Sequence, residues 1–479
     1  MEELLRNGTI AALVQALTSR QMSARELVGW YLNRIEALNQ SGPAINAVRE
    51  IARDALENAR RADEALAAGR RVGALHGIPV LLKDNVLTAD GMAAAAGCAA
   101  LKAFVPRREA TLVKRLRSAG AIILGKTNLT EFADYVSDVM PSGFSGVGGV
   151  VKNPQSLEPY GRGLGSSVGS AASVAARLAP VAIGSETQNS IQTPASVTSV
   201  YGFKPSVGVV SRYGLVPLVP SQDSPGVLCR SAEDAARVLA VAAGADAHDT
   251  ATLDVTHGLS DGPHARAAKT IRIGVPRRAM ADRADFAGVM SSFEAVLSRL
   301  SRGGVTIADP ADLPSAEQLQ DVRSSVFRTE FKAAINGFLD DHQGPCGIHS
   351  LRTLIEWNDA HPDAIPYGQS LLLAAEATTG LDDPQYRSDR LRDIALSRNA
   401  GIDGALAAAD LDALIAPMGA AAKCTGKAGA PAFAIPAGLD ASGAPFGVTL
   451  FTSRGGDRRL LDIGMTIAGI IGNSHAPAI

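Results

Sequence analysis

Apolar stretches alternate with helical ones along the first half of the chain. Residues 75–82 (LHGIPVLL) are mostly apolar, residues 109–118 have helical spacing and stop at Gly120, and residues 121–124 are apolar again. Alternation of strand and helix is the pattern of α/β folds, in which helices cover the faces of a sheet. The sequence therefore predicts an α/β fold with a large mixed, mainly parallel-cored β-sheet between layers of α-helices.

Local signals place further elements on both sides of this region. Ser23 and Glu26 have capping-box spacing ahead of apolar residues at helical intervals, which predicts a helix over residues 23–39. Residues 50–69, rich in Ala, Arg and Glu, predict a second helix. An apolar strand is predicted at residues 180–184. Later elements are predicted as strands at 270–275, 305–308, 413–416 and 433–435 and a helix at 286–300.

The 479 residues are long enough for two or three domains, but large α/β enzymes also reach this length as one unit. We predict a single domain over residues 1–479, with an N-terminal helical arm over residues 1–70 and a core at 71–230. Residues 310–400 are polar, helical and interrupted by prolines, and we interpret them as an insertion. Residues 246–269 have the composition of a surface linker.

Charge and hydropathy narrow the classes of partner. The formal net charge is −2 with mixed signs, so there is no basic field for nucleic acid. No apolar run reaches the roughly 20 residues of a membrane span, and the acidic, amphipathic N-terminus does not have the pattern of a signal peptide. We therefore expect a cytoplasmic protein with neither nucleic-acid nor membrane partners.

Cysteine and histidine patterns give no sign of a metal site. The four cysteines are far apart and lack CxxC spacing, and the eight histidines include no HExxH motif. We interpret the cysteines as small reduced core or loop residues. The expectation is a protein without metal or cofactor.

Residues 161–205 contain the strongest functional signal, a Gly/Ser loop followed by an Ala-rich helix, an apolar strand and a second Ser-bearing turn. Ser166 lies before this helix–strand unit and Ser190 after it, so a compact fold can bring both hydroxyls together. Ser190 lies on a turn whose successive backbone N–H groups could bind an oxyanion. The alternative is an exposed turn serine, and a catalytic serine needs a base from elsewhere in the chain.

Lys83 is a candidate for that base. It stands at the carboxyl end of the apolar run at residues 75–82, where α/β folds build their sites. A lysine at a strand end is commonly a solvated charge. If it is buried, desolvation lowers its pKa and leaves a neutral amine that can accept a proton near pH 7. Burial distinguishes the two interpretations.

A second interpretation concerns Ser167. Residues 165–169 (GSSVG) match GxSxG, the nucleophile elbow of α/β-hydrolases, with Ser167 as nucleophile. That motif needs a strand directly before the turn, whereas residues 157–164 are rich in Gly and Pro. A phosphate-binding loop is disfavoured because the GxxxxGK[ST] spacing is absent.

The combination of motifs resembles the amidase signature family from about residue 9 to the C-terminus. The resemblance lies in HGIPVLLKDN, GKTNLTEF, the GSS…GSETxxSI…PAS run and YGFKPSVGVVS. Three further motifs, SQDSPG at 221–226, YGQ at 367–369 and LDALIAP at 411–417, are most similar to the bacterial peptide-amidase branch. The resemblance identifies residues 71–230 as the catalytic signature core.

The family uses a Ser–cis-Ser–Lys triad. The resemblance implies Ser190 as nucleophile, Ser166 as bridging serine after a cis peptide bond, and Lys83 as base; the two serines are 24 residues apart, as in the family. It also implies an oxyanion hole made by backbone N–H groups of Thr187, Gln188, Asn189 and Ser190. The implied activity is hydrolysis of a carboxamide C–N bond through an acyl-serine, with a small-molecule amide as substrate and no cofactor; the chain could also form a homodimer.

Two departures from the family pattern leave alternatives open. Relatives usually carry small residues before the nucleophile, where this chain has Gln188 and Asn189, two amide side chains expected to crowd the pocket floor. Asn tolerates positive φ better than other non-glycine residues. Residues 418–430 are short where relatives have a longer pocket-shaping segment, so a more open pocket is expected. The alternatives are an acyltransferase with the same acyl-serine and a weakened, amidase-like binding protein.

Overall fold

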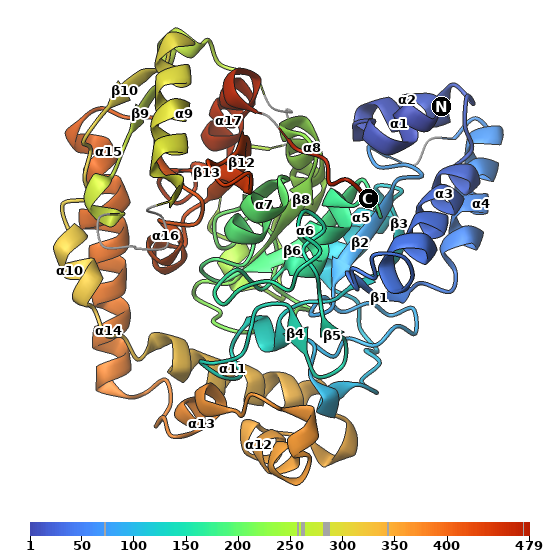
Figure 1. Ribbon diagram of the computed structural model, residues 1–479. Helices are drawn as coiled ribbons and strands as arrows, with labels where there is room; N and C mark the ends of the chain where they lie inside the picture. The colour runs from blue at the N-terminus through green and yellow to red at the C-terminus, as the bar shows by residue number, and fades with distance from the viewer. Residues whose placement is uncertain (71–72, 256–257, 260–263, 281–287, 343, 473) are drawn as a thin grey trace.

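A computed structural model describes residues 1–70, 73–255, 258–259, 264–280, 288–342, 344–472 and 474–479. Within these residues eleven strands form one sheet (Figure 1), and a separate pair is formed by β4 (Phe144–Ser145) and β5 (Gly149–Val150). In spatial order the sheet contains β1 (Val48–Ile51), β3 (Ile122–Thr127), β2 (Pro79–Lys83), β6 (Val181–Glu186), β8 (Ser224–Cys229), β7 (Tyr201–Lys204), β12 (Ala432–Leu439), β13 (Pro445–Phe451), β11 (Ala413–Pro417), β9 (Arg272–Gly274) and β10 (Thr306–Ala308).

The strand directions confirm a large mixed sheet but not a mainly parallel core. Parallel neighbours occur in two stretches, β3–β2–β6 and β11–β9–β10. Between them, β6, β8, β7, β12, β13 and β11 pair antiparallel. The short turn at residues 440–444 joins β12 to β13, and only antiparallel strands can be joined by so short a connection. The sequence analysis did not identify β13 and so missed this hairpin.

Helices cover both faces of the sheet, as the α/β prediction requires. The crossovers from β2 to β3 through α5 (Thr111–Ser118) and from β3 to β6 through α6 (Val168–Ala175) run in opposite directions along the sheet. Right-handed crossovers then place α5 and α6 on opposite faces. α7 (Gln192–Thr198) contacts α6, whereas α5 contacts α8 (Ala232–Ala242), which packs against α17 (Asp457–Ile471). α9 (Met290–Arg302) contacts α17; Phe286, where that helix was predicted to begin, lies outside the described residues.

The N-terminal arm contains α1 (Glu2–Asn7), α2 (Ile10–Thr18), α3 (Ala24–Ile35) and α4 (Ala55–Ala67). The capping box of Ser23 and Glu26 at the start of α3 is confirmed. The prediction of a helix from residue 50 is wrong at its start, because residues 48–51 form β1 and pair antiparallel with β3. Pairing at the edge of the sheet overrides the local helical preference there.

Residues 310–400 are mainly helical, as expected. The helices are α10 (Ala316–Asp321), α11 (Val326–His342), α12 (Leu351–Ala360), α13 (Ser370–Glu376) and α14 (Pro384–Ile394), followed by α15 (Gly404–Ala408) and α16 (Ala422–Ala428). α11 to α13 lie along the lower edge of the molecule in Figure 1. They share an apolar cluster with residues 87–104 and 132–140, which includes Leu87, Phe132 and Phe331. Across the described residues, none of the helices has the length and apolar character to span a membrane.

The order of the first strands determines where a site can form. From the central strand β2 the chain moves to β3 on one side and then crosses to β6 on the other. Such a reversal opens a crevice at the carboxyl ends of the parallel strands, where open α/β sheets bind ligands. Lys83 ends β2, and Ser185 and Glu186 end β6. The polar residues singled out from the sequence therefore meet at this edge.

Candidate active site

Lys83 is buried at the carboxyl end of β2, with no exposed surface. Its Nζ lies 2.7 Å from Ser166 Oγ and 3.1 Å from both the carbonyl oxygen and the Oγ of Ser185. Asn85 Nδ2 donates to the same Ser185 Oγ at 2.9 Å. The structure therefore selects the buried interpretation of Lys83 over the solvated one.

Burial also sets the protonation of this lysine. Desolvation lowers the pKa of Lys83 to about 7, against the opposing influence of the carboxylates of Asp223 and Glu186. A neutral amine has two N–H donors and one lone pair, and the Ser185 carbonyl oxygen can only accept. Above pH 7 the lone pair is therefore available to accept the hydroxyl proton of Ser166.

Ser166 is fully buried and follows a cis peptide bond with Gly165, the bond that the resemblance implies is cis. Its carbonyl oxygen accepts from Thr130 N at 3.1 Å. A Cβ on Gly165 would come within 3.1 Å of Ser142 Oγ and closer still to Thr130 Oγ1, so only glycine fits there. The backbone around Ser166 is thus held between the 130 and 142 loops.

The turn that carries Ser190 lies directly beside this loop. Ser167 N donates to the carbonyl oxygen of Ser190 at 3.0 Å, which brings the backbones of the two serine-bearing segments into contact. The carboxylate of Glu186 accepts from Ile191 N at 2.6 Å and from Gln192 N at 2.9 Å, and so fixes the start of α7. Ser190 is buried, with 6% of its surface exposed.

The backbone N–H groups of Thr187, Gln188, Asn189 and Ser190 have no hydrogen-bond acceptor among the described residues. Unpaired donors on one turn can bind a developing oxyanion. Neither Gln188 nor Asn189 has positive φ, so the turn does not depend on the left-handed tolerance of asparagine.

The side chains of this turn are tied to neighbouring loops. Asn189 Nδ2 donates to Gly163 O at 2.6 Å, and its Oδ1 accepts from Thr193 Oγ1. Gln188 Nε2 donates to Gln222 Oε1 at 3.0 Å. The two amides therefore point to different places, because Gln188 lines a cleft whereas Asn189 is folded back onto Gly163.

The segment at residues 418–430 also reaches this turn. It forms α16, and a Cβ on Gly426 would lie 2.7 Å from Gln188 Cγ and closer to the carbonyl oxygen of Thr187. The short Gly/Ala-rich segment noted in the sequence therefore packs against the turn.

Ser167 does not have the geometry of a nucleophile elbow. It precedes α6 directly, and residues 157–166 before it form turns and bends rather than a strand. Its buried Oγ donates to Ser185 O at 3.0 Å and accepts from Ser185 N at 3.2 Å. Ser167 thus joins the loop to β6.

Asp223, in the SQDSPG motif, holds the Ser190 turn through a hydrogen bond to Thr187. Its Oδ1 accepts from Thr187 Oγ1 at 2.6 Å, and its Oδ2 accepts from Leu218 N and Val219 N at 2.8 and 2.9 Å. In the sequence this motif contributed only to the resemblance, and Asp223, Ser185 and Asn85 were not predicted as site residues. Their positions in the quoted motifs SQDSPG, GSET and KDN were the available signal.

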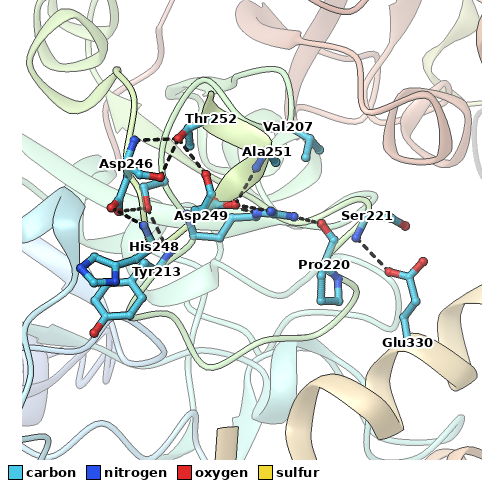
Figure 2. Close-up of polar contacts among 12 residues, drawn as sticks. Val207, Tyr213, Pro220, Ser221, Asp246, His248, Asp249, Ala251, Thr252 and Glu330 are labelled. Atoms are coloured by element: carbon cyan, nitrogen blue, oxygen red, sulfur yellow. Dashed lines mark hydrogen bonds and ion pairs between the residues drawn. The ribbon is translucent and has the colours of Figure 1, made fainter. Parts of the chain in front are cut away.

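Further polar contacts hold the loop that carries Asp223 (Figure 2). Arg212 donates to both carboxylate oxygens of Asp249 and to Pro220 O. Ser221 N donates to Glu330 Oε2 on α11 at 2.9 Å. Residues 212–223 therefore connect the 246–252 loop, α11 and the Ser190 turn.

We expect Asp223→Ala to lower the free energy of unfolding by about 2–4 kcal/mol, because two backbone N–H groups and the Thr187 hydroxyl lose a charged acceptor. Urea denaturation measures the change. The matched control is Ser221→Ala, since the buried Ser221 hydroxyl has no hydrogen-bond partner among the described residues. Equal stability losses in both variants would contradict the role assigned to Asp223.

The described cysteine side chains Cys98, Cys229 and Cys424 are free and buried, and that of Cys346 lies outside the described set. Within the described residues no three His, Cys, Asp or Glu side chains gather as a group that could hold a metal ion.

Comparison with known proteins places this arrangement in a family. The Amidase family matches residues 26–427. A probable amidase of Arabidopsis thaliana is 34% identical over 96% of this chain and 89% of its own length. The native peptide amidase of Stenotrophomonas maltophilia superposes with a TM-score of 0.90 at 36% identity over 98% of each chain. A peptide amidase in complex with the competitive inhibitor chymostatin gives 0.92 at 36% identity over 99% of each chain.

The family match covers most of the sequence, and the relatives share more than 30% identity over nearly the whole chain. The fold also agrees with the peptide-amidase branch in both its mixed sheet and its helical layers. These findings show that the protein belongs to the amidase family and is an amide hydrolase.

Proposed function

We propose that the protein cleaves a carboxamide C–N bond through an acyl-Ser190 intermediate, with Ser166 and Lys83 as proton carriers. The single observation that supports this most is the contact of a buried Lys83, whose pKa is lowered to about 7, with Ser166 Oγ at 2.7 Å. Such an amine is neutral at the pH where a base is needed.

In the proposed reaction, Ser190 Oγ attacks the carbonyl carbon while its proton passes to Ser166, whose own proton passes to Lys83 Nζ. The unpaired N–H groups of Thr187, Gln188, Asn189 and Ser190 would stabilise the negative oxygen of the tetrahedral intermediate. The C–N bond then breaks as Lys83 returns the proton through Ser166 to the leaving amine. Water, deprotonated by the same route, hydrolyses the acyl-Ser190 ester.

A peptide amide or another small carboxamide is the proposed substrate, because the two solved structures compared above are peptide amidases. The test is a panel of peptide amides, aryl amides and small aliphatic amides, with released ammonia or amine as the readout. Stoichiometric labelling by a fluorophosphonate reports the acylation step separately. Labelling without turnover of any amide would point to a weakened, binding-type protein, and failure of both would refute the proposal.

The pH dependence of the reaction follows from the pKa of Lys83. The base is the neutral amine, so kcat/KM for an uncharged amide is expected to fall as pH drops through about 7, by about 100-fold at pH 5 relative to the plateau. Stopped-time assays between pH 5 and 9 measure the profile. A flat profile between pH 5 and 8 would contradict Lys83 as the base.

Other buried groups titrate in the same range. Burial raises the pKa of the Glu131 carboxyl to about 7 and that of Asp234 to about 6, and it lowers the pKa of Lys126 and of Lys204 to about 8. Glu131 accepts from Gly146 N at 2.8 Å, whereas Lys83 contacts Ser166 and Ser185. Comparison of the pH profile with that of a Lys83 variant separates Lys83 from these groups.

A further inference from the structure

A cleft of about 520 Å³ opens beside the Ser190 turn. Gln188 and Gln222 line it next to the turn. The other walls come from residues 322–328 at the start of α11, from one side of α14 (Gln385, Asp389 and Asp393) and from α16. Consecutive Cα atoms are 3.8 Å apart, so the Cα atom of Gln188 lies within about 7 Å of that of Ser190. The cleft is therefore close enough to hold part of a substrate bound at Ser190.

The charged residues of this cleft are mostly basic. It is lined by two carboxylates, Asp389 and Asp393, and by four cations, which are Arg323, Arg328, Lys423 and Lys427. The surplus is positive, in a protein whose formal net charge is −2. A single sign of charge concentrated in a concave surface raises the local concentration of oppositely charged ligands.

The two carboxylates are already engaged by other partners. Asp389 Oδ2 accepts from the backbone N and the hydroxyl of Ser325, each at 2.7 Å, and Oδ1 pairs with Arg392. Asp393 pairs with the buried Lys427 and accepts from Ser324 Oγ at 2.8 Å. Both are buried. Neither carboxylate is placed to neutralise the exposed cations at the mouth of the cleft.

The exposed cations have no such partners. The side chains of Arg323, Arg328 and Lys423 are exposed, and none makes an ion pair or hydrogen bond to any residue that the structure describes. Lys423 lies one turn of α16 before Lys427. Burial lowers the pKa of Lys427, and the charge of Lys423 contributes in the same direction. Lys423 and Lys427 therefore repel one another, and an anion bound beside them would relieve that repulsion.

Helix α16 connects the cleft with the Ser190 turn. Gly426 packs against Gln188, and Lys423 and Lys427 lie before and after it on the same helix. The segment that distinguishes this chain from relatives thus supplies two of the four cations.

We infer that the cleft binds a carboxylate of the substrate, so that the preferred substrate is an amide carrying a free carboxylate near the scissile bond. This inference rests on the proposed acyl-Ser190 reaction and specifies its substrate class. The carboxylate can belong to the acyl part, as in the monoamide of a dicarboxylic acid. It can also belong to the amine part, as in an N-acyl amino acid. Both types of substrate present a carboxylate to Arg323, Arg328 and Lys423.

The experiment compares matched substrates on the full-length protein. One pair is a neutral acyl amide and the same amide with a carboxylate at the ω-end of the acyl chain. The other pair is a neutral N-alkyl amide and an N-acyl amino acid, whose amine part carries a free α-carboxylate. We expect one carboxylate member to have a kcat/KM at least about tenfold above its neutral partner, and the responding pair identifies the side of the bond. Because exposed charges are screened by salt, this ratio is expected to fall between 0.05 and about 0.5 M salt.

Charge-neutralising variants test the residues directly. Lys423→Gln is expected to lower the carboxylate-to-neutral ratio by about threefold to tenfold, mainly through KM, and Arg323→Gln and Arg328→Gln together to remove the preference. Lys114→Gln, an exposed lysine on α5 outside the cleft, is the matched control and should leave the ratio unchanged. A carboxylate-to-neutral ratio near one, or a ratio unchanged in the cleft variants, would overturn the inference. If neutral amides are still turned over in that case, the proposed reaction itself is unaffected. Absence of fluorophosphonate labelling would instead refute the reaction itself.

Discussion

Replacing Ser190 with alanine is expected to lower kcat/KM for any amide substrate by at least about 10⁴-fold, because the variant lacks the hydroxyl that forms the acyl bond. The same change should abolish labelling by a fluorophosphonate. Ser190 lies on the turn held by Glu186, which accepts from backbone N–H groups and not from the Ser190 side chain. Removal of the hydroxyl therefore leaves the turn in place, and thermal unfolding should change little.

Mapping the labelled peptide distinguishes Ser190 from its rivals. The label should be found on Ser190 in the unmodified protein and not on Ser167, whose Oγ is engaged by the backbone of Ser185. Ser167→Ala serves as the comparison because it removes a hydroxyl from the same region. Labelling that persists in Ser190→Ala but disappears in Ser167→Ala would refute the proposed nucleophile and favour the elbow interpretation.

Replacing Lys83 with alanine is expected to reduce kcat/KM by about 10³-fold, within the range of general acid–base catalysis. The buried amine is the basic group in contact with Ser166, at 2.7 Å, so its loss removes the proton acceptor for the attack. The acid limb near pH 7 should disappear together with the activity. Steady-state kinetics on a neutral amide between pH 5 and 9 provide both measurements.

Two controls make the Lys83 prediction specific. Lys83→Met preserves most of the side-chain volume but lacks the amine. Equal losses of kcat/KM in Lys83→Met and Lys83→Ala would therefore show that the missing base, and not a packing defect, lowers the activity. Small primary amines added to Lys83→Ala should restore part of the activity in proportion to the neutral amine present. A variant that keeps the acid limb near pH 7 would show that another group, such as Glu131, produces it.

Local patterns in the sequence were sufficient for many of the elements. The capping box of Ser23 and Glu26 and the strand before Ser190 lie where the sequence predicted them. The strand that leads to Lys83 was predicted to begin at residue 75 but begins only at Pro79. Each depends on residues within a few positions of one another, through apolar spacing or a side chain that pairs with nearby backbone. The α/β class followed from their alternation.

Long-range pairing could not be predicted in the same way. Residues 50 and 51 were included in a helical prediction, yet they pair with β3 more than 70 residues away. The antiparallel middle of the sheet depends on β7, β12 and β13, which come from distant parts of the chain. Strand direction is decided by which neighbours bury each other's faces, and sequence spacing carries little information about that choice.

For the candidate site too, local sequence and tertiary structure determine different properties. The sequence indicated the residue types and their positions, with Ser166, Ser190 and Lys83 at strand ends and turns, but left Lys83 open between a solvated charge and a buried base. The tertiary structure decided that question by enclosing Lys83 beside Ser166 and Ser185, since desolvation acts only when other segments exclude water. Lys423 comes beside the cleft through the packing of α16, and Arg323 and Arg328 through that of the 322–328 segment. By itself, then, the sequence determined the α/β class and the chemical groups of the site. The environment and partners of those groups, including the positive charge of the cleft, depended on contacts between segments far apart in the sequence, which only the folded chain brings together.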